Sequence, residues 1–373
     1  MSGGVDSSLS AALVREAGHE VVGITLKLWP CAEVDGGFVR DDACCSPTET
    51  MDARAVALST GVKHYVVDHE AEFRRGVVAN FLDGYRRGEI PNPCVRCNET
   101  VKFGSLWDHA QQLGAERVAT GHYARVAQAF DRHLLRCAVD RVKDQTYFLF
   151  SLTQEQLAHA EFPVGHLTKE AVREQSRARG LSTADKHESQ DICFIGSDGI
   201  SAFLRREIPE AFSPGEVRLA ADGRRLGEHL GLGAFTIGQR KGLGIAWHET
   251  LFVVDLDPAT NTVWLGPREA LLVSELPLRD CTWHVHPPTA NGLACKVRLR
   301  HRGVPVPAII VSRPGLGREG KPNAVVRFAT PQQRPSAGQA CVAYDDAIEH
   351  CLGGGWIDSK NSSRSLSAAL PDA

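Results

Sequence analysis

No hydrophobic run in the 373 residues approaches the ~18 residues that a membrane-spanning helix needs, and no charged and then apolar leader opens the chain. The sequence also lacks an excess of charge of one sign: 42 Lys and Arg face 45 Asp and Glu, so the net charge is −3. This balance argues against wholesale electrostatic attraction to nucleic acid, although basic residues gather in local clusters. With 43% hydrophobic and 23% charged residues, the composition excludes a disordered, collagenous or coiled-coil chain. We therefore expect a cytoplasmic protein of about two to three domains with no membrane partner.

The cysteines do not have the pattern of a disulfide-stabilised protein. There are 11 of them, an odd number, and their spacing is irregular. In a long chain without a secretory leader, such cysteines are expected to be reduced. A cysteine pair that matters here is therefore expected to have a chemical role.

Hydrophobic periodicity divides the chain into two parts with different patterns of predicted secondary structure. In the first part, helical segments alternate with short β-branched runs; the helices are predicted over 7–17, 48–60, 73–86 and 101–113, and the strands over 20–28, 63–67 and 117–120. This alternation predicts a doubly wound parallel sheet, whose ligands bind beyond the carboxyl ends of the strands. After Pro209, short strands with Gly and Pro punctuation predominate. The predicted order is an α/β catalytic domain (1–205), a small β-rich middle domain (206–270), a C-terminal β-barrel (271–357) and a disordered tail (358–373).

A Gly-rich turn stands before the first predicted helix, in Ser2-Gly3-Gly4-Val5-Asp6-Ser7-Ser8. Its glycines permit close backbone approach, and the amides and hydroxyls at a helix N-terminus can hold an anion, with Asp6 beside a hydrated or metal-bound phosphate. No Gly-Lys-Ser/Thr follows, which excludes a Walker loop, and no third Gly completes a dinucleotide fingerprint. The motif SGGxDS is typical of the pyrophosphate loop of the ATP-pyrophosphatase superfamily. The alternative interpretation is an ordinary Gly-Gly turn with a helix cap.

This type of loop normally follows a β-strand, yet only Met1 precedes it here. The strand would place the loop at the carboxyl edge of the sheet. We therefore expect a further strand encoded upstream of Met1.

A CxxC pair is formed by Cys94 and Cys97, within the segment Pro-Asn-Pro-Cys-Val-Arg-Cys-Asn. Half of a zinc site is one interpretation, but no second CxxC accompanies it, and its position does not match a thioredoxin-like pair. Between two predicted helices, Cys97 would lie near a helix N-terminus, where the dipole and Arg96 lower a thiol pKa and favour a nucleophile. Cys193 is a lone cysteine among apolar residues, for which a small buried hydrophobe is the plainer interpretation.

Six motifs follow one another along the chain: SGGVDSS, NPCVRCNETVKFG, ATGHYAR, KDQTYFLF, SQDICFI and GAFTIGQRKGLGI. Together they resemble the bacterial tRNA-specific 2-thiouridylases over about residues 1–357. Other pyrophosphate-loop families share the first motif and not the rest. The resemblance implies a Rossmann-like N-terminal domain of the adenine-nucleotide hydrolase type, ATP and Mg²⁺ as cofactors, and tRNA as substrate. It also implies a sulfur-carrier protein or a cysteine desulfurase as the persulfide donor.

The resemblance further implies roles for individual residues. Cys97 would be catalytic and Cys193 would carry a persulfide, with a disulfide between the two after sulfur transfer. ATP would bind at Ser2, Gly3, Gly4, Val5, Asp6, Ser7 and Ser8, with Leu26 beside the adenine and Gly121 closing the site. The target base would meet Asn92, Pro93 and Cys94, and tRNA would contact His122, Lys143, Asp144, Gln145, Arg300, His301 and Gln339.

Three alternatives remain at this point. Many family members carry Asp where this chain has Cys94, and a thiol with an ordinary pKa of about 8.5 is a weaker substitute for a carboxylate. Cys94, Cys97 and Cys193 could instead bind an iron–sulfur cluster that holds hydrosulfide. A synthetase that adenylates a small molecule would share the loop without needing Cys97 and Cys193. A catalytically inactive RNA-binding protein would keep the barrel and the basic clusters.

Overall fold

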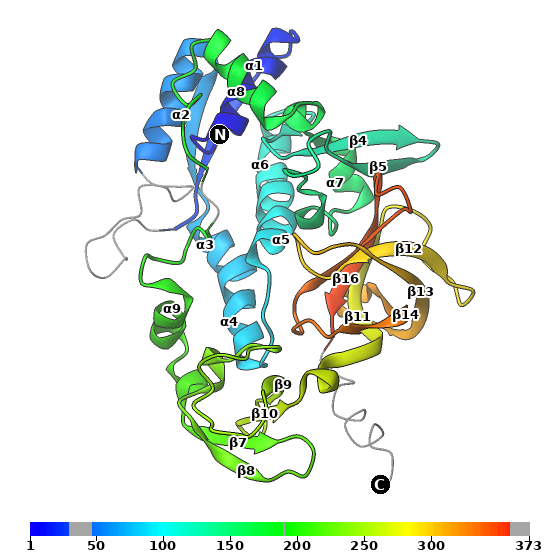
Figure 1. Cartoon of the computed structure of the whole chain (residues 1–373). Coiled ribbons are helices and arrows are strands. Elements are labelled where there is room, and N and C mark those ends of the chain that lie inside the picture. The colour runs from blue at the N-terminus through cyan, green and yellow to red at the C-terminus, as the bar shows by residue number, and fades with distance from the viewer. Residues whose placement is uncertain (30–46, 189–190, 359–373) are drawn as a thin grey trace. The chain divides into compact units, whose positions relative to one another are not determined.

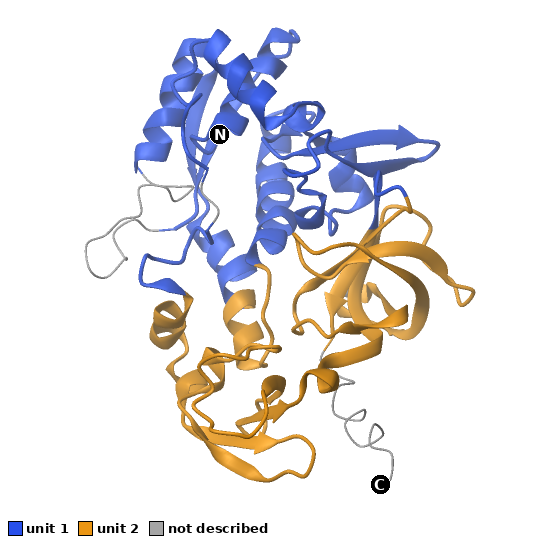
Figure 2. Ribbon diagram, viewed as in Figure 1, with its two compact units in different colours: residues 1–79, 93–199, 347–352 blue, residues 80–92, 200–346, 353–373 orange. Residues whose placement is uncertain are grey.

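The computed structural model describes residues 1–29, 47–188 and 191–358 (Figure 1). The chain divides into two compact units (Figure 2): unit 1 comprises residues 1–79, 93–199 and 347–352, and unit 2 comprises residues 80–92, 200–346 and 353–373. The predicted disordered tail lies outside the described residues except for Asp358. Ser189 and Gln190, which open the predicted persulfide motif, also lie outside them.

Unit 1 contains short parallel strand pairs joined through helices, as predicted for a Rossmann-like α/β domain. β1 (Val22–Lys27) pairs with β2 (Lys63–Asp68), and β3 (Val118–Ala119) pairs with β6 (Ala160–Glu161). A hairpin of β4 (Ala124–Ala129) and β5 (Arg132–Cys137) follows β3. The helical segments of this unit are α1 (Val5–Glu16), α2 (Pro47–Thr60), α3 (Glu70–Phe73), η1 (Arg74–Val78), α5 (Pro93–Cys97), η2 (Asn98–Ser105), α6 (Leu106–Gln112), η3 (Thr146–Phe148), α7 (Gln154–His159), η4 (Pro163–His166) and α8 (Lys169–Ala178). The helix α4 (Ala79–Arg86) belongs to unit 2 except for Ala79.

The first helix anchors the N-terminal loop to the core. Val5 and Leu9 of α1 are buried and pack in a cluster with Val172 of α8. The hydroxyl of Ser10 donates to the backbone oxygen of Asp6 one turn earlier (2.8 Å), so this polar residue is satisfied inside the helix. Burial of one apolar face therefore fixes where the helix, and the loop before it, lies.

The helix predicted over 101–113 begins earlier than expected, at Pro93. Proline is favourable at a first helical position because its missing N–H would have no partner there. The run continues from α5 into the wider turns of η2 and then into α6, with a kink at Gly104 (φ −110°, ψ −106°). The amide of Gln156 donates to the backbone oxygens of Glu99 (2.9 Å) and Phe103 (2.8 Å), which satisfies carbonyls at this irregular stretch. The predicted start was wrong because the wider turns of η2 interrupt the 3.6-residue period, so that Pro93 was not recognised as a helix start.

Unit 2 contains the predicted small β-rich domain. Its four-stranded sheet has the order β8-β7-β10-β9, in which β7 and β10 are parallel and the other neighbours antiparallel. Apolar side chains of this sheet, including Val217, Val253 and Val263, form their own core. The elements are α9 (Gly199–Glu207), η5 (Pro209–Phe212), β7 (Gly215–Leu219), β8 (Arg225–His229), η6 (Leu232–Ala234), β9 (Phe252–Asp257), β10 (Thr262–Gly266) and η7 (Arg268–Leu271).

Six strands close into the predicted C-terminal β-barrel, in the order β11-β14-β13-β12-β15-β16, with β16 pairing back to β11. Inward and outward residues alternate along most of these strands, and all of β15 is buried. The strands are β11 (Leu272–Trp283), β12 (Leu293–Arg298), β13 (Val306–Leu316), β14 (Pro322–Gln333), β15 (Ala340–Tyr344) and β16 (His350–Ile357), with η8 (Arg318–Gly320) between β13 and β14.

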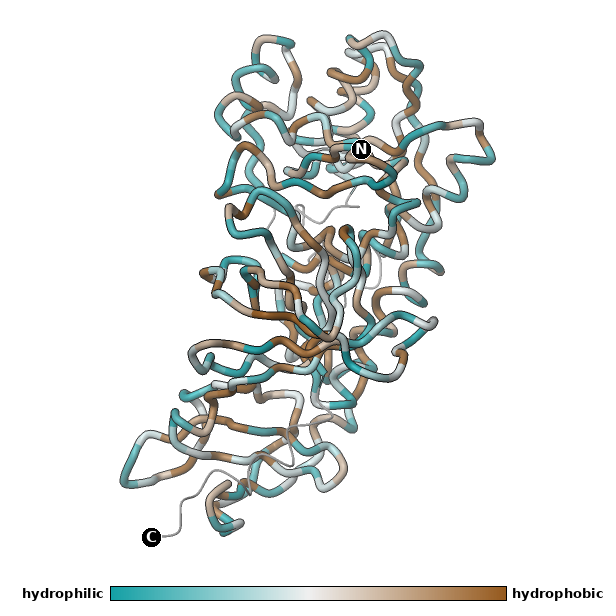
Figure 3. The backbone as a smooth tube through the Cα atoms, turned by 90° about the vertical axis from the view of Figure 1, so that its right-hand side faces the viewer, coloured by the Kyte–Doolittle hydropathy of each residue, from teal (hydrophilic) through white to brown (hydrophobic). Residues whose placement is uncertain are grey.

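Hydrophobic and hydrophilic residues alternate along the backbone in short stretches (Figure 3). Among the residues that the structure describes, no helix combines the length and the apolar character needed to cross a membrane.

Candidate functional site

The loop before α1 leaves the N-terminus of this helix open. Gly4 is the N-cap, in an extended conformation (φ −89°, ψ 161°), and has no side chain to accept a hydrogen bond from the first turn. A Cβ on Gly4 would meet only the Ser2 hydroxyl, at 3.8 Å. Gly3 is left-handed (φ +73°), and a Cβ there would collide with the backbone of Glu49. Gly3 thus shapes the turn, whereas Gly4 leaves free space beside uncapped amides, which is the arrangement that binds anions.

Serine hydroxyls brace this loop from within. Ser7 donates to the backbone oxygen of Gly4 (3.1 Å), and so does Ser8 (2.9 Å). The hydroxyls of Ser2 and Ser7 lie 3.2 Å apart. These contacts preorganise the loop, so an anion would meet a shape that already exists.

Two further predicted nucleotide residues lie on elements beside the loop. A Cβ on Gly121 would lie 2.6 Å from the backbone nitrogen of Ser7, so Gly121 packs directly against the loop backbone. Leu26 is half-buried in β1. Its neighbour Thr25 donates a hydrogen bond to the backbone oxygen of Met1 (2.7 Å), which holds β1 beside the start of the loop.

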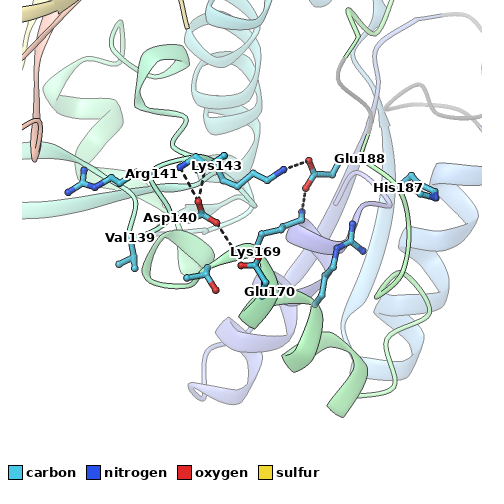
Figure 4. Close-up of a pocket in the computed structure, with 11 residues that line it drawn as sticks. Val139, Asp140, Arg141, Lys143, Lys169, Glu170, His187 and Glu188 are labelled. Carbon is cyan, nitrogen blue, oxygen red and sulfur yellow. Dashed lines mark hydrogen bonds and ion pairs between the residues drawn. The ribbon is translucent and has the colours of Figure 1, made fainter. Parts of the chain in front are cut away.

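Lys169, the ion-pair partner of Asp6, lines a pocket of about 760 Å³ (Figure 4). The ammonium of Lys169 donates to both carboxylate oxygens of Asp6, at 2.8 and 2.9 Å. Charged side chains dominate the pocket wall. The lining residues are Val139, Asp140, Arg141, Val142, Lys143, Thr168, Lys169, Glu170, Arg173, His187 and Glu188.

The CxxC pair lies at the start of the helical run from Pro93. Cys94 is exposed and Cys97 is buried, with 8% of its surface exposed. The prediction placed Cys97 near a helix N-terminus; it is the last residue of α5 and lies about one turn after the start of the helix at Pro93. Arg96 forms an ion pair with Glu99 (3.0 Å), so its charge is shared with a carboxylate and not held for the thiol alone. The predicted activation of Cys97 by the helix dipole and Arg96 therefore does not follow from this geometry.

Cys193 is half-buried, and the next residue anchors its segment. The ring of Phe194 packs on Phe73 (centroids 5.7 Å apart) and on Trp29 (5.9 Å). In residues 1–29, 47–188 and 191–358, no three His, Cys, Asp or Glu side chains are grouped as metal ligands. Cys94, Cys97 and Cys193 are thus not arranged as a cluster site, and these residues do not fit the iron–sulfur alternative.

The predicted tRNA segments of unit 1 are held together next to the loop. His122 follows Gly121 and bonds through Nδ1 to the hydroxyl of Thr120 (2.8 Å). Burial, with a further effect of Lys102, holds the pKa of His122 well below its usual range, so the imidazole is neutral. Gln145 accepts a hydrogen bond from the backbone nitrogen of Tyr123 (2.8 Å) and ties the two segments to each other.

Asp144 has a different environment from its neighbour Lys143. It is 2% exposed, and its oxygens accept hydrogen bonds from the backbone nitrogen of Ala138 (2.9 Å) and the hydroxyl of Thr146 (2.7 Å). A buried carboxylate with internal partners organises the turn and is not presented to a partner molecule. The Lys143 side chain, by contrast, lines the pocket.

The remaining predicted residues, apart from Pro93, belong to unit 2. Arg300 is exposed and follows β12, whereas His301 is half-buried. Burial first, and then Arg302 and Arg298, lower the pKa of His301 to about 4. Gln339 is half-buried and donates to the backbone oxygen of Ile90. Asn92 is half-buried at the end of the segment 80–92, while Pro93 is buried at the start of α5 in unit 1.

Sequence patterns did not reveal Lys169, Glu188 and Tyr123, the residues around Asp6. Lys169 and Asp6 are 163 positions apart, and only the fold brings them together. The local signal was limited to Thr168, a residue type that commonly caps helices, directly before Lys169.

Family models match nearly the whole chain in three successive segments. The tRNA methyl transferase HUP domain matches residues 1–197, the tRNA methyl transferase PRC-barrel domain matches residues 201–267, and the aminomethyltransferase beta-barrel domain matches residues 273–357.

Individual relatives are similar along their length. A tRNA-specific 2-thiouridylase of Bradyrhizobium diazoefficiens is 43% identical over 380 residues, covering 100% of this chain and 93% of the relative. The protein of the same name from Chloroflexus aurantiacus is 44% identical over 358 residues, covering 96% of each chain. That of Rickettsia massiliae is 42% identical over 358 residues, covering 96% of this chain and 95% of the relative.

Proposed function

Because the chain belongs to the family of tRNA-specific 2-thiouridylases, it is a tRNA sulfurtransferase, and we propose that it uses ATP to exchange a uridine oxygen for persulfide sulfur. The substrate would be carbon 2 of the wobble uridine in tRNA. The observation that carries the ATP-dependent part is the uncapped N-terminus of α1 beside the open Gly4. The full-length similarity to 2-thiouridylases supports the choice of substrate.

The loop residues Ser2 to Ser8 would hold the phosphates of ATP, with Gly121 against them and Leu26 toward the adenine. Free space at Gly4 and amides without a side-chain cap fit a phosphate group. Mg²⁺ on the nucleotide would neutralise phosphate charge, mostly through phosphate and water oxygens. Both Asp6 oxygens already accept hydrogen bonds from Lys169, and the described residues contain no group of three His, Cys, Asp or Glu side chains that could hold the metal by themselves.

Adenylation would come first, because a carbonyl oxygen of uracil is a poor leaving group. This oxygen attacks the α-phosphorus of ATP, and pyrophosphate leaves with the electron pair of the broken P–O bond. The amides of α1 would stabilise the charge that gathers on the departing pyrophosphate. Carbon 2 is then bonded to a good leaving group and open to a sulfur nucleophile.

Sulfur would arrive as a persulfide on Cys193, loaded by a sulfur-carrier protein or a cysteine desulfurase. In one route the Cys97 thiolate attacks the Cys193 sulfur, and the hydrosulfide released displaces AMP from carbon 2. In the other, the terminal persulfide sulfur displaces AMP, and Cys97 then cleaves the S–S bond. Both routes end in 2-thiouridine and a Cys97–Cys193 disulfide, which an external dithiol reduces by two electrons. The half-exposed position of Cys193 supports its loading by a protein donor.

We extend the proposal to the surfaces that meet tRNA. Asn92, Pro93 and the exposed Cys94 would face the target base, and His122, Lys143 and Gln145 would contact tRNA beside the nucleotide. Arg300, His301 and Gln339 would add contacts from unit 2. Asp144 would support this surface from inside. A cytoplasmic location and the domain boundaries after residues 205 and 270 belong to the same proposal.

A methyl group on Gly4 tests the nucleotide site, with tRNA-dependent pyrophosphate release and ATP affinity as readouts. Gly4→Ala should fold with a loss of at most about 1 kcal/mol, because the new Cβ meets only Ser2 at 3.8 Å and the only cost is that Ala is a poorer N-cap than Gly. Its ATP affinity should fall about ten- to hundredfold, since overpacking against a phosphate costs about 1–3 kcal/mol.

Gly18→Ala, beyond the other end of α1, is the matched control. Gly18 is left-handed (φ +91°) with open space around it, so the variant should lose about 1 kcal/mol of stability and keep its ATP affinity. Unchanged ATP affinity in Gly4→Ala would show that phosphates do not approach this loop.

A further inference from the structure

Lys169 is a buried cation at a position that helix electrostatics disfavour. It is 6% exposed and is the first residue of α8, after the N-cap Thr168. The positive end of the helix dipole and the loss of water both oppose an ammonium there. A lysine is stable at such a position only when nearby anions compensate for both effects.

Two carboxylates compensate Lys169, and one of them belongs to the pyrophosphate loop. Its ammonium lies 2.8 and 2.9 Å from the oxygens of Asp6 and 2.6 Å from Glu188. Tyr123 donates its hydroxyl to Asp6 (2.8 Å), and its ring faces the ammonium at 5.6 Å. Burial and the nearby Asp6 raise the pKa of Tyr123, so this phenol keeps its proton and remains a donor. Lys169 and Tyr123, which lie far from Asp6 in sequence, therefore fix the orientation of its carboxylate.

The side chain and backbone of Lys169 are both fixed (Figure 4). Asp140 accepts hydrogen bonds from the backbone nitrogens of Lys169 (3.0 Å) and Lys143 (3.1 Å) through its two oxygens. The second oxygen of Glu188 pairs with Lys143 (2.7 Å). Burial raises the pKa of Glu188, but hydrogen bonds from Lys143 and Lys169 outweigh it and bring it to about 2. The bridge is thus charged at neutral pH and holds Lys169 in place.

We propose that Lys169 is a positioning residue for the nucleotide: it fixes the carboxylate of Asp6 and offsets the negative charge that Asp6 places beside the phosphates of ATP. The inference rests on the proposed ATP site. Without Lys169, Asp6 would be a less constrained anion next to a polyphosphate. The repulsion between the Asp6 carboxylate and the phosphates would then oppose nucleotide binding. Lys169 acts through Asp6, so its loss should affect ATP more than tRNA.

Calorimetric titration of the full chain with ATP and Mg²⁺ tests this role, because it reads nucleotide affinity without requiring turnover. Lys169→Met should weaken ATP binding on the order of 30-fold, as expected when one partner of a buried charge pair is removed. Lys169→Arg keeps the charge and should recover most of the affinity. The affinity for tRNA should fall less than the affinity for ATP in both variants, because Lys143, the proposed tRNA contact on the same bridge, keeps its own ion pair with Glu188.

Arg177→Met is the matched control, because Arg177 is an exposed cation on the same helix, paired with Asp185. It should bind ATP like the wild type. Tyr123→Phe is a milder second variant, which removes only the hydroxyl that Asp6 accepts and should weaken ATP binding about fivefold.

The proposal would be overturned if Lys169→Met bound ATP as tightly as the wild type. If Lys169→Met does not fold, the same conclusion would follow from equal ATP affinity in Tyr123→Phe and wild type. Weak ATP binding by both Lys169→Met and Lys169→Arg, accompanied by lower melting temperatures, would indicate a structural role and also overturn it. A wild type that binds no ATP would refute the nucleotide site together with this inference. A wild type that binds ATP but releases no pyrophosphate with tRNA would refute only the proposed reaction.

Discussion

The cysteines of unit 1 and those of the barrel differ in their surroundings more than in their burial. Cys97 of unit 1 and Cys295 of the barrel are each 8% exposed. Burial raises the pKa of Cys295 to about 12, and it raises that of Cys341 further, where neighbouring Cys295 and Cys281 add to the effect. Cys97 instead lies in a helical turn beside the ion pair of Arg96 and Glu99. Depth alone therefore does not separate a cysteine that packs a core from one proposed to react.

The comparison teaches that the polarity of a thiol's surroundings, and not its depth alone, separates a core cysteine from one that is proposed to react. In the barrel, burial raises the pKa of Cys281, Cys295 and Cys341, so these thiols stay protonated and act as small apolar groups. In unit 1, Cys94 is exposed and Cys193 half-buried, so reagents and protein donors can reach them.

Replacing cysteines in the two regions should give the largest contrast. We expect Cys97→Ala and Cys193→Ala to form less than about 1% of the wild-type 2-thiouridine, because each removes a sulfur that the proposed reaction needs. Both should retain tRNA-dependent pyrophosphate release, since adenylation precedes sulfur transfer. Both products can be measured in one reconstituted reaction.

Cys295→Ala is the control for that experiment, equal in burial to Cys97. It should keep its specific activity once the folded fraction is taken into account. Normal 2-thiouridine formation by Cys193→Ala would show that the reaction does not need a persulfide on Cys193.

A smaller effect should appear in the pH dependence of stability. Because burial raises the pKa of Cys295 from 9.0 to about 12, the unfolded chain loses this proton first. The contribution of the protonated Cys295 thiol to the free energy of unfolding is complete below pH 9 and is lost as the pH rises from 9 toward 12. One such thiol removes up to about 1.4 kcal/mol of unfolding free energy per pH unit in that window.

Urea unfolding between about pH 8 and 10.5 measures this slope in wild type and Cys295→Ala. The variant should be less stable at neutral pH but fall less steeply above pH 9. Val297→Ala, a buried apolar neighbour on β12, should lower stability without changing the slope. Parallel curves for wild type and Cys295→Ala would contradict the protonated barrel thiol.

Local patterns predicted the elements and the loop well. The predicted helix over 7–17 is α1 (Val5–Glu16), and the strand over 63–67 is β2 (Lys63–Asp68). Both follow from periodicity and Gly punctuation. The β4–β5 hairpin was not predicted, because its two-residue turn, Phe130-Asp131, has an aromatic residue at the left-handed position (φ +54°) where Gly or Asn is usual.

The arrangement of the site was less predictable, since it depends on long-range pairing. Nothing near Lys169 in sequence indicates that it bonds to Asp6, and nothing near Asp144 indicates that this carboxylate is buried. The motifs identified the segments that form the site. The burial of each side chain and its hydrogen-bond or ion-pair partner are set by tertiary packing.

Mass spectrometry of tRNA nucleosides tests the central claim most directly, in cells that lack this gene and in cells complemented with wild type or Cys193→Ala. The account predicts that 2-thiouridine derivatives disappear on deletion, return with the wild-type gene and stay absent with Cys193→Ala. Loss of a methylated nucleoside with unchanged 2-thiouridine would contradict it, and so would unchanged 2-thiouridine alone.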